Sequence, residues 1–259
     1  MNDLFDVSGK VALVTGGSRG IGEMIAEGYV ANGVKTYISA RKAEACNATA
    51  ARLSEIGECV SIPADLSTMD GIKSLTDAIN DHENQLDILV NNAGAAWGAP
   101  LGEFPESGWD KVMDINVKSP FFLSQALLPL LEKSASAGDP ARIICIGSAD
   151  GLNVNRLPNY AYGPSKAAVH HLARTLAAHL ADRNITSNAI APGPFPSKMT
   201  AGIMKKYCKQ IRQGVPLKRI GEPGDMAGAA IFLVSKAASY ITGVVIPVDG
   251  GITGCAGTL

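Results

Sequence analysis

The chain has 259 residues, of which 46% are hydrophobic and 18% are charged, and its formal net charge is −1. This composition favours a compact core and excludes a disordered chain, and the near-neutral charge gives no electrostatic reason to expect binding to nucleic acid or to a membrane surface. No apolar run reaches transmembrane length, and the acidic first six residues lack the apolar core of a signal peptide. We therefore expect a cytoplasmic protein of one large or two small α/β domains.

Neither metal binding nor disulfide formation is indicated. The five cysteines are scattered without CxxC spacing, and the four histidines show no ligand spacing. We expect the cysteines to be reduced packing residues, and we expect no metal site. His170 and His171 are adjacent, so on a helix they would face different sides.

A glycine-rich turn at residues 15–22 (TGGSRGIG) directly follows the first apolar run, residues 11–14. A helical pattern then continues to a stop at Asn32 and Gly33. Glycines let backbone amides approach a pyrophosphate, and the N-terminus of the following helix adds positive potential. The spacing is G-x-x-x-G-x-G, and a glycine turn alone is weak evidence, but its place between strand and helix predicts a nucleotide-binding loop.

The second predicted strand, residues 34–39, ends in Ala40, Arg41 and Lys42. An acidic residue at this point receives the ribose hydroxyls of NAD, whereas an arginine accommodates the 2′-phosphate of NADP. Here the acid is missing, and Arg19 in the glycine-rich turn could clamp the phosphate together with Arg41. The alternative is a solvated arginine at a strand end. We favour NADP(H).

Helices and strands alternate along the rest of the chain. The predicted helices are residues 43–56, 68–82, 106–131, 160–180 and 225–235, and the predicted strands are residues 59–63, 86–90, 142–147, 185–191 and 244–248. No linker or repeat interrupts the alternation. It predicts one domain over residues 1–259, a Rossmann-like, doubly wound, seven-stranded parallel sheet with helices on both faces.

Several polar or irregular segments follow predicted strands, at the edge where parallel sheets bind ligands. Residues 91–94 (NNAG) follow the fourth strand, Ser148 the fifth, and the proline-rich residues 192–196 the sixth. Asp65 and Leu66 follow the third strand and could meet an adenine ring, although they equally suit a helix cap. Asn116 lies in the middle of a long predicted helix, which indicates either a surface position or a functional kink.

Tyr162 and Lys166 are four residues apart at the start of a predicted helix, so their side chains would point the same way. A cation beside a phenol lowers the pKa of the phenol from about 10, and the tyrosine could then exchange a proton with an alcohol or carbonyl oxygen. Tyr160 is a poorer candidate because Pro164 follows it at the same spacing. Taken alone, the pair would also suit an ordinary helix surface.

Together these motifs resemble the short-chain dehydrogenase/reductase family over nearly the whole chain. The matching segments are residues 15–22, Asp65, residues 91–94, Asn116, Ser148, residues 162–166 (YGPSK), and Pro192 with Gly193. Within the family, the chain is similar to NADP(H)-preferring 3-oxoacyl (β-ketoacyl) reductases, including the rhamnolipid-pathway type. Two departures stand out: Ser197 occupies a position where the family often has threonine, and the loop at residues 149–158 is long.

The resemblance implies a role for each matched residue. Tyr162 would be the general acid/base, Lys166 would lower its pKa and hold the nicotinamide ribose, Ser148 would hydrogen-bond the substrate oxygen, and Asn116 would position a water. The expected cofactor-binding residues are Gly16, Gly17, Ser18, Arg19, Gly20, Ile21, Gly22, Arg41, Asp65, Leu66, Asn92, Ala93, Gly94, Tyr162, Lys166, Pro192, Gly193, Phe195 and Ser197.

We therefore expect an NADPH-dependent reductase of a 3-oxoacyl group or similar ketone. The alternatives are an NAD(P)-dependent dehydrogenase of a secondary alcohol or sugar acid, and a non-catalytic NADPH-sensing regulator. Residues 197–215 suit a substrate flap, and the candidate pocket residues are Trp97, Leu152, Phe195 and Met199. Apolar surplus on the helices predicted at 106–131 and 160–180 predicts a homo-oligomer, a tetramer or a dimer.

Overall fold

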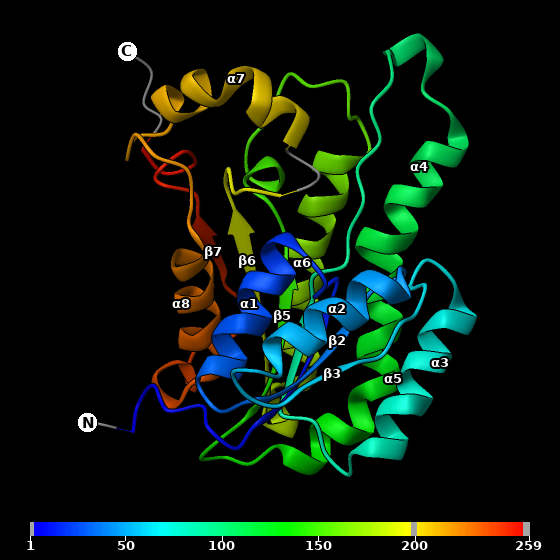
Figure 1. The fold of residues 1–259 in the computed structure, drawn as a ribbon, viewed down its shortest axis with the longest axis vertical. Coiled ribbons are helices and arrows are strands. Elements are labelled where there is room, and N and C mark those ends of the chain that lie inside the picture. The colour runs from blue at the N-terminus through cyan, green and yellow to red at the C-terminus, as the bar shows by residue number, and fades with distance from the viewer. Residues whose placement is uncertain (1–2, 198–200, 256–259) are drawn as a thin grey trace.

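The computed structural model describes residues 3–197 and 201–255 and contains a seven-stranded parallel sheet. The strand order is β3-β2-β1-β4-β5-β6-β7, so the sheet is wound in both directions from the boundary between β1 and β4, as predicted (Figure 1). The strands are β1 (Val11–Thr15), β2 (Lys35–Ser39), β3 (Cys59–Ser61), β4 (Ile88–Asn91), β5 (Ala141–Ile146), β6 (Ile185–Pro192) and β7 (Val245–Val248).

Helices cover both faces of the sheet, because each central strand is apolar on both sides. Helices α1 (Gly20–Ala31), α2 (Ala43–Leu53) and α8 (Pro223–Val234) pack on one face, and α3 (Met69–His82), α5 (Ser119–Ser134) and α6 (Tyr162–Leu180) pack on the other. Neighbouring strand residues alternate between the two cores. In β1, for example, Val14 joins the first core and Leu13 the second.

The long helix predicted at residues 106–131 is interrupted. The structure has α4 (Glu106–Met113), a π-helical turn (Asp114–Lys118) and then α5. Pro120 in the first turn of α5 lacks the N–H that would continue the α-helical ladder, which accounts for the widened turn before it. Asn116 lies in this turn and is buried, so of the two interpretations of this residue the surface position is wrong.

The segment predicted as a weakly structured flap contains a helix, α7 (Ala201–Gly214), which is kinked at Tyr207. Met199, a candidate pocket residue, lies outside the described residues. The other predicted ends differ from the observed ones by at most three residues.

Within the described ranges, no helix is long and apolar enough to cross a membrane. The same part of the chain holds no group of three or more His, Cys, Asp or Glu side chains that could bind a metal. All five cysteines are free, but only Cys46, Cys59 and Cys145 are buried, so the expected packing role is wrong for the exposed Cys255.

Candidate active site

The glycine-rich turn connects β1 to α1 and is fixed by β4. Thr15 donates its hydroxyl to the carbonyl of Val90 (3.1 Å) and accepts the backbone N–H groups of Asn92 and Ala93 (3.0 Å each). The Asn92 amide donates to the carbonyl of Thr15 (2.7 Å). The side chain of Asn92 therefore holds the turn in place through its amide N–H groups.

The turn has the geometry of a phosphate cradle. Gly16 and Gly20 have φ angles of +66° and +58°, a region that favours glycine. A Cβ at Gly17 would lie 2.7 Å from Ile38 of β2, so the turn packs closely on the sheet. Gly20 begins α1, and its amide end therefore faces the same edge as the turn.

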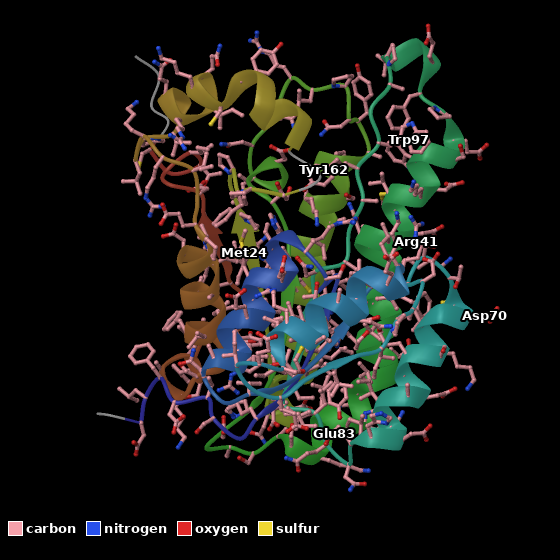
Figure 2. All side chains as sticks on the ribbon, viewed as in Figure 1. Met24, Arg41, Asp70, Glu83, Trp97 and Tyr162 are labelled. Carbon is pink, nitrogen blue, oxygen red and sulfur yellow. The ribbon has the colours of Figure 1, made fainter. Side chains whose placement is uncertain are left out.

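Arg19 and Arg41 are exposed on either side of this turn, and neither forms an ion pair with any other described residue. Arg41 follows β2 and lies at the start of α2 (Figure 2). Burial opposes the ionised form of Asp65, but hydrogen bonds from Ser67 and the charge of Arg41 hold the pKa of Asp65 below its ordinary value. The Asp65 carboxylate accepts hydrogen bonds from the backbone N–H and the hydroxyl of Ser67, just before α3. Because Asp65 is bound to Ser67 in this way, the two arginines remain available to an anion.

Tyr162 and Lys166 lie on the first turns of α6, at the carboxyl edge of the sheet (Figure 2). The Lys166 ammonium donates to the carbonyl of Ile146 at the end of β5 (2.8 Å) and lies 5.7 Å from the centre of the Tyr162 ring. Ser148 follows β5 two residues later. The sheet and α6 thus bring together three of the four predicted catalytic residues.

Asn116 approaches the same group from the π-helical turn. Its amide accepts from the backbone N–H of Ala95 (2.8 Å) and donates to the carbonyl of Ala95 (3.0 Å) and the hydroxyl of Ser165 (2.9 Å). A Cβ at Gly94 would lie 3.2 Å from the Asn116 amide oxygen and 3.5 Å from the Lys166 ammonium. The π-helical turn therefore ties α6 to the segment that follows β4.

The expectation that Lys166 lowers the pKa of Tyr162 is wrong for this structure. Burial raises the pKa of Tyr162 to about 12; a hydrogen bond from Ser148 opposes this rise, and the nearby carboxylate of Asp150 adds to it. Burial also lowers the pKa of Lys166 to about 8. Desolvation dominates both groups because α6 carries them into the protein. Tyr162 is therefore held protonated, in the form that can donate a proton.

Two of the candidate pocket residues pack elsewhere. The Phe195 ring is buried against Gly221, where a Cβ would meet the ring carbons. The Trp97 ring packs on α4, 2.7 Å from a Cβ built on Gly108, and the Lys111 ammonium lies 5.1 Å from its centre. Leu152 is 41% exposed, four residues after Ser148, and remains a candidate for contact with a substrate.

The sequence interpretation missed two residues beside Ser148. His170 is buried, and its Nε2 atom accepts from the backbone N–H of Ser148 (3.4 Å). Asp150 accepts from the side chain of Asn155 (2.6 Å) while its backbone N–H donates to the hydroxyl of Ser148 (3.1 Å). Helical spacing was the available signal for His170, which lies four residues beyond Lys166 and eight beyond Tyr162.

A phosphate-cradling turn at the switch point of a parallel sheet, beside a half-buried tyrosine with a buried lysine and serine, is the arrangement of a nucleotide-dependent oxidoreductase. The chain belongs to the short-chain dehydrogenase/reductase family: a family model described as enoyl-(acyl carrier protein) reductase matches residues 16–253. The chain is also 51% identical over 253 residues to the rhamnolipids biosynthesis 3-oxoacyl-[acyl-carrier-protein] reductase of Pseudomonas aeruginosa, covering 97% of this chain and 99% of the relative.

Solved structures agree with this assignment. The Pseudomonas aeruginosa RhlG/NADP active-site complex superposes with a TM-score of 0.94 at 51% identity, covering 98% of this chain and 100% of the other. A more distant structure, 7α-hydroxysteroid dehydrogenase complexed with NADH and 7-oxo glycochenodeoxycholic acid, has a TM-score of 0.89 at 33% identity and covers 97% of each chain. The fold is therefore shared by relatives that bind different nicotinamide cofactors.

Proposed function

We propose that this protein is an NADPH-dependent reductase of 3-oxoacyl thioesters or closely similar ketones. The observation that carries the proposal is the position of the half-buried Tyr162 beside the buried Lys166 and Ser148, at the same sheet edge as the glycine-rich turn. The 51% identical relative is named as a 3-oxoacyl-[acyl-carrier-protein] reductase, which supports this substrate class over a sugar acid.

NADPH, when bound, supplies the hydride for the carbonyl carbon. The backbone amides of residues 16–22 would hold the pyrophosphate, and Arg19 and Arg41, which form no ion pair with any residue in the described ranges, would hold the 2′-phosphate. The adenosine half would meet Asp65, Leu66 and the backbone of residues 92–94. The nicotinamide half would meet Lys166, the backbone of residues 192–195, and Ser197, whose Cβ lies 3.3 Å from a Cβ built on Gly20.

Tyr162 would donate its phenolic proton to the carbonyl oxygen, and Ser148 would donate a hydrogen bond to the same oxygen. Lys166 would orient the ribose while its contact with Ile146 fixes its position. Asn116 would act through Ala95 and Ser165, whose backbone and hydroxyl its amide already contacts. Its remaining acceptor capacity leaves room for the water that the family resemblance implies.

The test is NADPH oxidation in the presence of 3-oxoacyl N-acetylcysteamine thioesters, 3-oxo esters and keto-sugars. We expect turnover with the thioesters, and a loss of about a hundred- to ten-thousandfold in Tyr162→Phe with NADPH binding retained. Turnover of gluconate with NADP⁺ and none of the thioesters would favour the dehydrogenase alternative instead. NADPH binding with no turnover of any substrate would favour a regulator.

We further propose a cytoplasmic homo-oligomer. Phe121 on α5 is 40% exposed and packs edge-on against Phe122, with ring centres 5.1 Å apart. Trp109 on α4 is also 42% exposed. Exposed aromatic residues on α4 and α5 support a partner subunit, with a tetramer or a dimer as the result.

A further inference from the structure

An acidic side chain, Asp150, lies in the loop between Ser148 and Tyr162 and is half-buried there. Its backbone N–H donates to the hydroxyl of Ser148 (3.1 Å), and its carboxylate accepts from the amide of Asn155 (2.6 Å). The Asn155 amide oxygen in turn accepts the backbone N–H of Leu157 (2.8 Å). The position of Asp150 is therefore fixed both at its backbone and at its carboxylate.

The turn that contains Asp150 packs on the start of α6. A Cβ at Gly151 would lie 2.7 Å from the α6 backbone, and a Cβ at Gly163 would lie 3.2 Å from the carbonyl oxygen of Asp150. The end of the loop joins the same turn of α6, because Tyr162 donates its backbone N–H to the carbonyl of Asn159 (2.8 Å). The loop thus holds an acidic residue against the helical turn that carries Tyr162.

The negative charge of Asp150 is not neutralised by a salt bridge to any residue in the described ranges. Its turn packs on α6 and β6, and β6 has no titratable side chain. Over residues 162–170 of α6, the titratable side chains are Tyr162, Lys166 and His170. The Lys166 ammonium donates to a carbonyl of β5, and the low pKa of His170, about 4, keeps its ring neutral. Asp150 is therefore an uncompensated charge at this end of α6.

This charge acts on Tyr162. Burial gives the larger part of the raised pKa of Tyr162, and the carboxylate of Asp150 adds to it. The reason is that a negative charge beside a phenol repels the phenolate. The Asn155 amide favours the charged form of Asp150 by donating a hydrogen bond to it. Asp150 therefore favours the form of Tyr162 that donates a proton over the form that accepts one.

We propose that Asp150 is a positioning residue that acts through Tyr162: its carboxylate restricts the pH range in which Tyr162 accepts a proton from an alcohol. The inference rests on the proposed function and deepens it. In oxidation, the alcohol gives its hydroxyl proton to the Tyr162 phenolate and its hydride to bound NADP⁺, which leaves a ketone and NADPH. Reduction reverses both transfers. With Asp150 charged, oxidation needs a higher pH, whereas reduction continues over a wider range of pH.

The test is the pH profile of kcat/KM in both directions, with a 3-oxoacyl N-acetylcysteamine thioester and NADPH, and with the matching 3-hydroxyacyl thioester and NADP⁺. Asp150→Asn removes the charge and keeps an acceptor for Asn155. In this variant we expect both profiles to move to lower pH, because the phenolate forms more easily. Oxidation at pH 7 should become about threefold to tenfold faster, as expected for the loss of one nearby charge.

Three further variants separate charge from structure. Asp150→Ser also lacks the charge and should move the profiles in the same direction, so it decides the question if Asp150→Asn does not fold. Asn155→Leu removes the hydrogen bond but keeps the carboxylate, and it should lower kcat in both directions without moving the profiles. Asp182→Asn removes an exposed acidic residue elsewhere and is the control for net charge.

Profiles that stay in place in both Asp150 variants, or that move to higher pH, would overturn the proposal. An equal movement in Asn155→Leu would assign the effect to the geometry of the loop, and an equal movement in Asp182→Asn would assign it to net charge. Either result removes the specific role of Asp150. Failure of the proposed function is distinct, because the unmutated protein would then neither reduce the 3-oxoacyl thioester nor oxidise the 3-hydroxyacyl thioester.

Discussion

The Nε2 atom of His170 lies 3.4 Å from the backbone nitrogen of Ser148 and accepts its N–H. The ring fills a space that two glycines leave open: a Cβ at Gly151 would lie 2.8 Å from it, and one at Gly147 would overlap it. Because Nε2 accepts, the proton resides on Nδ1, which is buried without a partner in the described part of the chain. Burial and the charges of Lys166 and Arg174 lower the pKa of His170 to about 4, which keeps the ring neutral.

This contact predicts that His170 positions Ser148, which we propose to contact the substrate oxygen. In His170→Met, which fills the space without an acceptor, we expect kcat to fall about tenfold, because a net hydrogen bond is worth about 1 kcal/mol and the serine loop also loses its alignment. His170→Gln can place an acceptor near Nε2 and should recover most of kcat, with NADPH binding unchanged in both. His171→Gln, at an exposed neighbouring position, is the control. Equal losses in the Met and Gln variants would reduce the role of His170 to packing.

Lys166 is expected to destabilise the ligand-free protein. Its pKa is about 8 in the folded state against an ordinary value of 10.5. Below pH 8 the amine is charged in both folded and unfolded states, so folding carries the full cost of burying the charge. Between pH 8 and 10.5 the folded state loses the proton first, and the cost disappears. Lys166→Met should therefore raise the free energy of unfolding at pH 7. Removing the buried charge contributes at most about 3 kcal/mol, and losing the hydrogen bond to Ile146 offsets about 1 kcal/mol of that gain.

Urea unfolding at pH 7 and pH 10.5, at one protein concentration, measures this difference. The stabilising effect of Lys166→Met should shrink or reverse at the higher pH, although the variant is inactive at both. Lys133→Met, at an exposed position on α5, should show no comparable pH dependence. Equal destabilisation by Lys166→Met at both pH values would contradict the direction of the shift.

The cofactor prediction concerns Arg41. Arg41→Asp should weaken NADPH binding by roughly thirtyfold, since one charge-assisted contact is worth about 2 kcal/mol, and should affect NADH much less. Isothermal titration with both cofactors measures this, with Lys133→Asp as a charge-matched control. If the unmutated protein binds NADPH and NADH equally well, the two arginines do not serve a 2′-phosphate.

The assembly prediction concerns Phe121, the exposed member of the aromatic pair on α5. Phe121→Asp should dissociate the oligomer or lower its order, because it places a charge in the proposed apolar interface. Ile56→Asp, at a position that is 52% exposed after α2, is the control. Light scattering reports the mass. A mass near 26.9 kDa for the unmutated chain would exclude the oligomer.

Local signals in the sequence predicted the fold well, and long-range contacts account for what they missed. Apolar runs, glycine turns and alternating elements were enough for the seven strands, because each strand is buried on both faces and reads as a continuous apolar run. The helix at 106–131 was predicted without its π-helical turn. Whether Pro120 widens the turn before it depends on the hydrogen bonds that hold Asn116 to Ala95 and Ser165. These contacts join residues 21 and 49 positions apart.

The sequence indicated which residues are candidates for the site, but it did not predict their pKa values. Four-residue spacing placed Tyr162 beside Lys166, but spacing carries no information about solvent. Burial decides the pKa of both groups, and it comes from elements far away in sequence. In the same way Phe195, within the proline-rich residues 192–196, was named only as an apolar candidate for the pocket, and its packing could not be predicted because Gly221, which is distant in sequence, opens the space that its ring fills.

The last prediction concerns residues 197–215 as a lid. The described part of this segment is Ser197, α7 and Val215, and the kink of α7 at Tyr207 (φ −128°, ψ 20°) divides the helix into two parts. Its C-terminal end is fixed, because Val215 is buried and packs against Gly250, where a Cβ would lie 2.6 Å from it. A long, largely exposed helix fixed at one end suits closure over bound substrate.

Hydrogen exchange should then show slower exchange across α7 only when NADPH and a substrate analogue are both bound. The reference is α3, which lies far from the proposed lid and should be unaffected. Unchanged exchange across α7 in a ligand-saturated sample would show that it is a fixed part of the surface.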